Sequence, residues 1–595
     1  MVSAGHAWKR GGPVGGAERG MARGSRRSLI VRVLALPVAV AVGVLGWTLP
    51  RGGHDAPKAA PPGGPPGAAT VGTTAYAVPK DALFVAPSGD DAAAGTRKAP
   101  LRTLGKAVQA AEPGGTVVLR GGTYHETVTV PSGKRLTIQS YPREAAWLDG
   151  SSAVGRWTAR DGAWESDGWT ARFDSSPTYT QGAPESGDPD FRFVSPEHPM
   201  AAHPDQLWVG GEAQRQVGSR GEVKGGTFYV DEAGGRIVMG SDPRGREVRA
   251  STLGEAITIR GAGTVLRGVG VRRYATSLPQ MGSVKVAAPD VIVENVAVTD
   301  SATTGLSVLA PGARVQKVTA TRNGLLGIHG NEADGLRLVG VRAARNNLEH
   351  FKYSPVSGGV KVTRTRTVTI ANSVAVDNLG KGLWLDESVR NASIAGTRVV
   401  RNADHGIVLE LSAGAVVAGN VVRDNGGDGI KVNNTSDVQI WNNTFSGNGR
   451  TVHLVQDRRR PGDPGTPGRD PRQRTPDPAL TWRTGKITVS SNTLAAPRPG
   501  ADCLLCVEDH SRERSGAQMD LTVDGNAYAA GGAAPRWLVV WPKGKGDPAT
   551  YGDLGGFRSA TGQEASGGTA RPLPGRVAKL LDKPAGSRHM GAWLS

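Results

Sequence analysis

The chain has 595 residues, of which 85 are glycine and only 5% are aromatic, and this composition excludes a compact helical protein with an aromatic core. Lysine and arginine outnumber aspartate and glutamate by 71 to 53, which gives a formal net charge of +18. No basic helix with interleaved aromatic residues occurs, so we expect an acidic polymer such as an anionic polysaccharide as partner, and no nucleic acid.

Residues 1–50 are basic at first and then apolar from Leu29 to Leu49, a pattern that predicts an export signal or a transmembrane anchor. A cleaved signal peptide and an uncleaved anchor both fit this pattern, so a membrane tether is one of two alternatives. Residues 51–80 are rich in Pro, Gly and Ala and predict a linker that cannot pack a core. We therefore predict an extracellular or cell-surface protein.

Residues 81–150 begin the folded part with one amphipathic helix between short strands. The helix is expected around residues 101–111, because apolar side chains recur there at helical spacing. Strands are expected at residues 83–86, 116–120, 127–130 and 135–139. The stretch 82–130 resembles the N-terminal cap of secreted right-handed parallel β-helix proteins. That resemblance implies a helix that covers the open end of the first coils.

Residues 151–250 break the pattern and predict an inserted β-rich subdomain. Alternating runs at residues 206–209, 227–230 and 236–239 are joined by glycine turns, which favours a small antiparallel sheet. The segment resembles inserts of β-helical carbohydrate-active enzymes. The insert could serve as a structural lid or brace, or it could take part in substrate binding, and both alternatives stay open.

Two residue types recur along residues 251–450 at a spacing of about 23 residues, which is typical of stacked repeats. The glycines that open apolar alternating runs are Gly305, Gly327, Gly359, Gly382, Gly406 and Gly429. The asparagines are Asn323, Asn346, Asn378, Asn402, Asn425 and Asn448, which we expect to stack at a turn of the coil. This periodicity predicts an all-β fold, a parallel β-helix of PbH1-type repeats, and excludes leucine-rich repeats and propeller blades.

Side chains that follow each repeat glycine alternate between the core and the outer face. The first and third residues are apolar and predict the core, so the second and fourth face outward. One outward row contains His329, Lys361, Trp384, Val408 and Lys431, and the other contains Asn331, Thr363, Asp386, Glu410 and Asn433. Asp386 and Glu410 then occupy the same position on neighbouring strands, which lie about 4.8 Å apart.

Like charges on adjacent strands destabilise a sheet, so the placement of Asp386 beside Glu410 requires an explanation. Relief by Lys361 and Lys431, a shared cation and a catalytic acid pair are the three alternatives. A retaining glycosidase holds its two carboxyl groups about 5–5.5 Å apart, close to the strand spacing. Trp384 would then offer an apolar face on which a sugar ring could stack.

The motifs GKGLWLDE and HGIVLELS, one turn apart, resemble bacterial β-helical glycoside hydrolases of the pectate-lyase-like superfamily. The resemblance implies a retaining glycoside hydrolase without a cofactor or metal, in which Asp386 and Glu410 are catalytic. Candidate contacts to a polysaccharide or oligosaccharide substrate are Trp384, Lys361, Lys431, His329, Asn433 and, from the loop in the longest repeat, His350.

Two alternatives stay open. A polysaccharide lyase or uronate epimerase would use Lys361 or Lys431 as base, with calcium held by nearby carboxylates. A non-catalytic glycan-binding surface protein would tolerate the loss of both carboxylates.

Residues 451–480 are charged and rich in Pro and Gly, which predicts a disordered loop. Residues 481–595 contain two more strand–asparagine units and predict terminal coils and a C-terminal cap. For the two cysteines, Cys503 and Cys506, a local disulfide and two small apolar side chains are both open. We expect a monomer.

Overall fold

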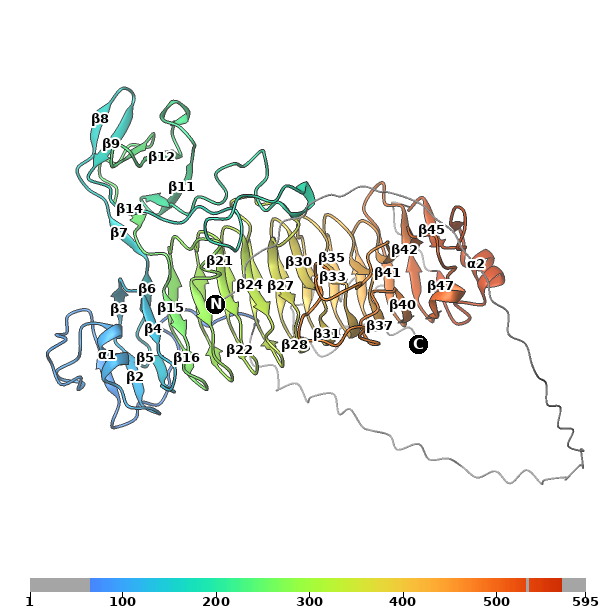
Figure 1. Ribbon diagram of the computed structural model, residues 1–595, viewed down its shortest axis with the longest axis horizontal. Coiled ribbons are helices and arrows are strands. Elements are labelled where there is room, and N and C mark those ends of the chain that lie inside the picture. The colour runs from blue at the N-terminus through green and yellow to red at the C-terminus, as the bar shows by residue number, and fades with distance from the viewer. Residues whose placement is uncertain (1–64, 531–533, 570–595) are drawn as a thin grey trace, which may run out of the picture. The chain divides into compact units, whose positions relative to one another are not determined.

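A computed structural model of the chain describes residues 65–530 and 534–569. Its parallel strands form three sheets of 13 strands each, and the chain passes through each sheet once per turn of a coil (Figure 1). The predicted all-β parallel β-helix is confirmed. The export segment expected in residues 1–50 and residues 51–64 of the expected linker lie outside the described residues, so the membrane tether stays a prediction. No helix within the described ranges is long and apolar enough to cross a membrane.

The second of these sheets carries the candidate site on its outer face. In spatial order its strands are β4 (Val128–Val130), β15 (Ile257–Ile259), β18 (Val284–Val286), β21 (Thr304–Val308), β24 (Leu326–Asn331), β27 (Gly358–Thr363), β30 (Lys381–Asp386), β33 (Ile407–Glu410), β36 (Ile430–Asn433), β39 (Val452–Gln456), β42 (Cys503–Asp509), β45 (Trp537–Trp541) and β46 (Ala549–Tyr551). All neighbours in this order pair in parallel except β45 and β46. The other two sheets run from β1 (Leu83–Val85) to β43 (Leu521–Asp524) and from β3 (Gly122–Tyr124) to β47 (Gly568–Thr569).

The core is a continuous stack of aliphatic side chains from all three sheets. The first and third residues after each repeat glycine are buried in it, as their alternation predicted: Leu306, Val308, Val360, Val362, Leu383, Leu385, Ile407, Leu409, Ile430 and Val432. The second and fourth residues lie outside this core. The apolar pattern therefore fixes which side chains point toward the candidate site.

Stacked asparagines hold one corner of the coil. From Asn323 to Asn448 each side-chain NH₂ donates to the side-chain oxygen of the next asparagine at 2.8–2.9 Å, as the repeat predicted. A second ladder, which the sequence analysis missed, joins Asn420, Asn443, Asn492 and Asn526 at 3.0 Å. It ends on Glu564, whose Oε1 accepts from Asn526 at 2.7 Å.

Both ends of the coil carry a short helix. At the N-terminal end, α1 (Leu104–Ala110) is capped by Thr103 and buries Leu104, Ala107 and Val108 in the main core. It packs against β1, β2 (Thr116–Leu119) and β4, which include the first strands of two sheets. Near the other end, α2 (Leu554–Thr561) packs beside β46. These positions suit the two caps that the sequence predicted.

The insert forms an eight-stranded sheet with its own small core. Its strands, in spatial order, are β7 (Ser151–Ala153), β14 (Val248–Ser251), β10 (Leu207–Val209), β11 (Glu212–Gln216), β12 (Thr227–Asp231), β13 (Arg236–Met239), β9 (Ala163–Asp167) and β8 (Thr158–Arg160). The expected antiparallel arrangement holds except for β11 and β12, which pair in parallel. Between β9 and β10, the segment 168–206 runs along the β-helix (Figure 1).

The chain between β39 and β40 (Gly485–Ser490), which we call the cover loop (residues 457–484), contains no helix or strand. The sequence predicted disorder for residues 451–480, whereas the structure packs the cover loop on the coil. Asp470 is fully buried and pairs with Arg472 at 2.9 Å and with Arg366 at 3.4 Å. Ser388 donates to the carbonyl of Gly468 at 3.0 Å. The two cysteines of β42 form a local disulfide, one of the two alternatives that the sequence left open.

Candidate active site

Asp386 and Glu410 lie at equivalent positions of two neighbouring strands, as the repeat register predicted. Leu385 of β30 pairs with Leu409 of β33, and the next residue of each strand is the carboxylate. Both carboxylates line one cavity of about 1010 Å³ on the outer face of the second sheet. Such a volume suits a bound small molecule or a short oligosaccharide.

Asp386 is buried beside a cation. Its Oδ2 accepts a hydrogen bond from the Lys361 ammonium at 3.0 Å, and its Oδ1 accepts from the backbone N–H of Glu387 at 2.7 Å. Burial raises the pKa of Asp386 to about 7, with Lys361 opposing the rise and the charge of Glu410 adding to it. The side chain can therefore keep a proton near neutral pH.

Glu410 is held by three donors. Arg459 donates to Oε1 at 2.6 Å, Asn433 lies 3.4 Å from the same oxygen, and the Trp384 indole N–H donates to Oε2 at 3.2 Å. Burial alone would raise the pKa of Glu410, but the charges of Arg459, Lys431 and Lys361 lower it overall. One carboxyl of the pair thus favours the protonated form and the other the ionised form.

Trp384 does not form the sugar platform that we expected. Its side chain is only 4% exposed, because neighbouring loops fold over this face of the sheet. The ammonium groups of Lys361 and Lys381 lie over the ring, 3.5 Å and 4.2 Å from its centroid. The indole therefore donates to Glu410 and lies against two cations, with almost none of its surface exposed.

The two lysines expected to contact substrate lie in different surroundings. Lys361 is buried and lines the cavity, where Asp386 and the carbonyl of Pro355 accept from its ammonium. Lys431 is half-buried and does not line the cavity, although its charge lowers the pKa of Glu410. Both lysines face outward from the coil, as predicted, but only Lys361 reaches the candidate site.

The two candidate histidines do not line the cavity. His329 is buried against the ring of Tyr179, and burial together with the charge of Lys361 lowers its pKa to about 4. His350 is exposed and stacks on His198 with the ring centroids 4.4 Å apart. Segment 168–206 contributes both ring partners, Tyr179 and His198, and substrate contact by the two histidines stays a prediction.

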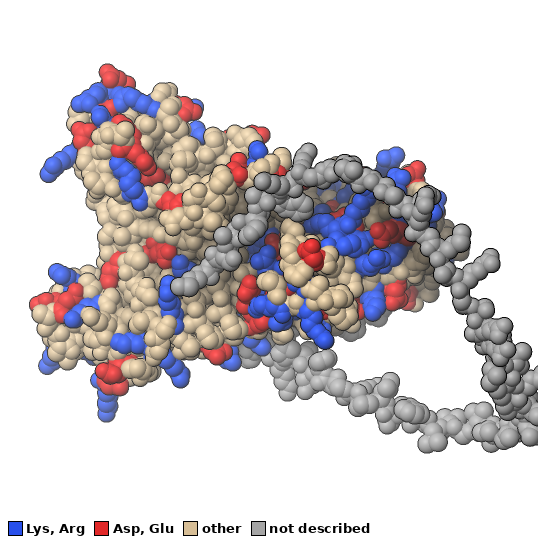
Figure 2. Space-filling view, in the orientation of Figure 1, with Lys and Arg blue, Asp and Glu red and all other residues tan. Residues whose placement is uncertain are grey.

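Three segments outside the strands of the coil complete the cavity. The insert contributes Asp190 and Phe191, loop 345–357 contributes Lys352, Ser354 and Pro355, and the cover loop contributes Arg459, Arg460, Thr466, Pro467, Gly468 and Trp482. The sequence analysis missed Arg459, which lies in the stretch it expected to be disordered. Near the cover loop, Lys and Arg side chains lie close to Asp and Glu side chains (Figure 2), in line with the pairs Arg459–Asp457 and Arg460–Glu513.

Lys381 was also missed. It is buried under Trp384, and its ammonium pairs with Asp404 at 2.9 Å and donates to the carbonyl of Tyr353 at 3.1 Å. Burial lowers the pKa of Lys381, against the pull of Asp404. Its contacts link the floor of the site to loop 345–357.

The carboxylates that calcium would need in a lyase already have cationic partners. Asp386 pairs with Lys361, Glu410 with Arg459, Asp404 with Lys381, and Asp428 with His453 at 2.8 Å. Within the described ranges, no group of three or more His, Cys, Asp or Glu side chains is arranged to hold a metal ion. Calcium binding remains an expectation of the lyase alternative alone.

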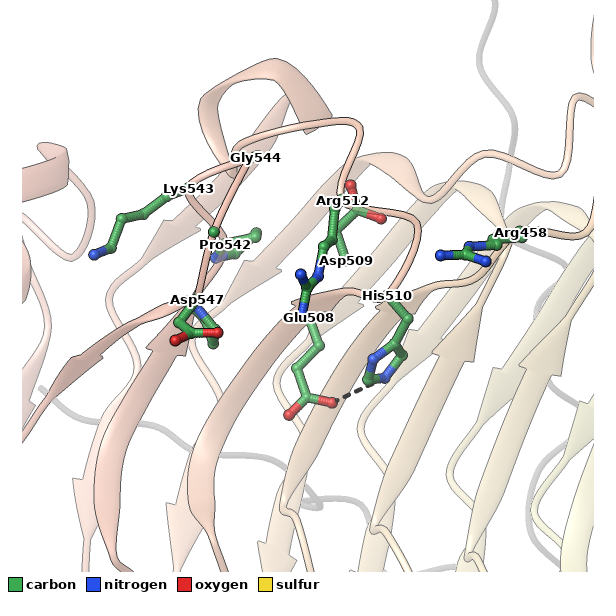
Figure 3. A pocket seen from close by; sticks show the side chains of 11 residues that line it. Arg458, Glu508, Asp509, His510, Arg512, Pro542, Lys543, Gly544 and Asp547 are labelled. Atoms are coloured by element: carbon green, nitrogen blue, oxygen red, sulfur yellow. Dashed lines mark ion pairs between the residues drawn. The ribbon is translucent and has the colours of Figure 1, made fainter.

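A second, smaller cavity of about 330 Å³ lies further along the same sheet, beyond β42 (Figure 3). Glu508 at its floor pairs with His453 at 3.1 Å and with His510 at 3.4 Å. The hydrogen bond from His453 lowers the pKa of Glu508, against the effect of burial. Asp509, which also lines this cavity, likewise has a lowered pKa against the effect of burial, because Ser511 and backbone N–H groups donate to its carboxylate, so these two carboxyl groups differ from Asp386, whose pKa is raised.

Comparison with known proteins supports the fold. A family model described as a right-handed β-helix region matches residues 284–456, and one for a protein family of unknown function (DUF1565) matches residues 87–130. The uncharacterized protein YwoF of Bacillus subtilis is 42% identical over 78 residues, and pectate lyase PEL9 of Emericella nidulans is 38% identical over 79 residues. Each match covers 12% of this chain, and the matches span only 17% and 19% of the two relatives.

Among solved structures, the complex of XylC with xylose is similar over 77% of this chain and 85% of its own, with a TM-score of 0.57 and 14% sequence identity. At this identity the similarity concerns the fold and leaves the chemistry to the site. The stacked sheets, the family match and the XylC structure all indicate the same fold. The chain has the right-handed parallel β-helix fold.

Proposed function

We propose that the protein is a carbohydrate-active enzyme, a retaining glycoside hydrolase that uses Asp386 and Glu410. The observation that carries the proposal is that two carboxyl groups on adjacent strands line one cavity with pKa values displaced in opposite directions. Such a pair holds one proton between its two pKa values. A retaining mechanism needs that state, in which one group donates a proton to the leaving oxygen and the other attacks the sugar.

The surrounding contacts support this chemistry. Strand spacing of about 4.8 Å brings the carboxyl groups near the separation of about 5–5.5 Å that a nucleophile and an acid need. Lys361 and Arg459 each hold one oxygen of one carboxylate, and the cavity beside them has room for a sugar. The xylose in the XylC structure agrees with a carbohydrate substrate.

The alternative of a lyase or epimerase needs a free base near the substrate. Lys361 is bound to Asp386 and Pro355, and Lys431 does not line the cavity. We therefore favour hydrolysis. An extracellular or cell-surface location belongs to the same proposal.

The test is a glycan panel assayed with the wild type, Asp386→Asn, Glu410→Gln and the control Asp377→Asn, whose carboxylate pairs with Arg401 away from the cavity. We expect hydrolysis of at least one glycan by the wild type and the control. Either substitution in the pair should lower kcat by about a hundredfold or more. Unsaturated products, binding without turnover, or full activity in either variant would contradict the proposal.

A further inference from the structure

Large apolar side chains are exposed beside the candidate active site. Within the described ranges four are exposed: Phe191, Leu348, Tyr353 and Trp441. Leu348 and Tyr353 lie in loop 345–357, and Phe191, 53% exposed, lines the catalytic cavity itself. Three of the four therefore lie on segments that border one cavity, which is typical of a binding surface.

The backbone around Phe191 is held in place. The residue ends a short 3-10 helix, η1 (Pro189–Phe191), in which the Asp188 carboxylate accepts from the backbone N–H of Asp190 at 3.0 Å. Lys352 donates from its ammonium to the carbonyl of Pro189 and from its backbone N–H to the carbonyl of Phe193 at 2.9 Å. The backbone that carries the exposed ring is thus held between the insert and loop 345–357, so that a ligand need not order this segment.

The polar groups around the ring favour an uncharged ligand. Asp190 lines the cavity next to Phe191 and forms no ion pair with any described residue, so its carboxylate can accept hydrogen bonds from hydroxyl groups. A carboxylate group of the ligand at this place would be repelled by the negative charge of Asp190. The Lys352 ammonium keeps its positive charge while it donates to the carbonyl of Pro189, so this end of the cavity carries one charge of each sign, which suits an uncharged ligand.

An aromatic ring has a negative face, which attracts the C–H groups on the apolar face of a pyranose with equatorial hydroxyls. Trp384 cannot serve this purpose, since two ammonium groups lie over its ring. We propose that Phe191 is the stacking platform for a neutral pyranose ring, and that the substrate is a neutral oligosaccharide reaching from the carboxylates to the insert. The inference rests on the proposed function for the position of the cleaved bond.

The test measures binding of xylotriose, cellotriose and trigalacturonate by calorimetry to Glu410→Gln protein, in which turnover is blocked. Phe191→Ala in that background should weaken binding of at least one neutral trisaccharide by about threefold to tenfold. Phe191→Trp should retain binding, because it keeps an aromatic face. Trp441→Ala is the matched control, since Trp441 is 44% exposed but does not line the cavity.

Tighter binding of trigalacturonate than of either neutral sugar, unchanged binding in Phe191→Ala, or no binding of the neutral sugars would overturn the inference. Its failure differs from that of the proposed function. If the neutral sugars bind through Phe191 but the wild type hydrolyses nothing, the hydrolase proposal fails alone. If the wild type hydrolyses a glycan and Phe191→Ala leaves its KM unchanged, the platform fails alone.

Discussion

Arg459 donates a 2.6 Å hydrogen bond to Glu410 across 49 residues of sequence. The guanidinium comes from the cover loop, whereas the carboxylate ends strand β33 of the coil. The contact joins an irregular segment to the regular part of the fold. It also provides a direct test of how the charge of Glu410 is set.

Arg459→Ala should raise the pKa of Glu410, because burial then acts with less opposing positive charge. The acidic limb of the kcat/KM profile should move to higher pH, and activity at slightly acid pH should fall about tenfold. Arg459→Lys should recover part of the shift. The measurement is the pH profile of all three proteins, and an unmoved acidic limb in Arg459→Ala would contradict this role.

The wild type should show a bell-shaped pH profile. Above a pH of about 7 the raised pKa of Asp386 is passed, the proton leaves the pair and the rate falls. At low pH Glu410 also takes up a proton and the rate falls again. Because the pKa of Glu410 is lowered, this fall should occur at a pH below the ordinary pKa of a glutamate. A profile of kcat/KM that keeps rising through neutral pH would argue against a protonated Asp386.

Trp384→Phe tests whether the indole positions Glu410. The substitution removes the N–H donor to Oε2 while keeping an aromatic ring under the two lysines. We expect kcat to fall while KM stays nearly constant, because the Trp384 side chain is almost fully buried and offers little surface to substrate. A rise in KM with unchanged kcat would restore the stacking role that the structure argues against.

The asparagine ladder should contribute strongly to stability. Asn402 is buried and donates to Asn425 at 2.9 Å and to the carbonyl of Ala375 at 3.2 Å, while it accepts from Asn378 at 2.8 Å. Asn402→Ala leaves these partners unsatisfied and should cost about 2–4 kcal/mol of unfolding free energy. Chemical denaturation measures it, with Ser393→Ala on the outer face of a strand as control. Equal stability of both variants would refute the estimate.

The repeat made the fold and the carboxylate pair predictable from sequence. The repeat of about 23 residues predicts which side chains face the core, the asparagine ladder and the shared position of Asp386 and Glu410. It does so because strands in register bring equivalent residues together. Lys361 beside Asp386 follows from the same register, since it is paired with Trp384 on the next strand. These contacts need no knowledge of the loops.

The sequence could not predict which segments cover the outer face of the second sheet. Arg459, Phe191 and Lys352 lie on segments without periodicity, and their positions depend on contacts between parts of the chain far apart in sequence. The same segments bury Trp384 and His329, which alternation alone placed in solvent. A basic residue in a charged loop, such as Arg459, carries no local signal that it reaches a buried carboxylate.

The central claim is that Asp386 and Glu410 act together on one sugar from adjacent strands. Proton NMR of the first product, taken before mutarotation of a glycan that the wild type cleaves, tests it most directly. The account predicts an anomeric configuration identical to that of the substrate, and loss of this product in both Asp386→Asn and Glu410→Gln. An inverted configuration, or an unsaturated sugar in place of a hydrolysis product, would contradict it.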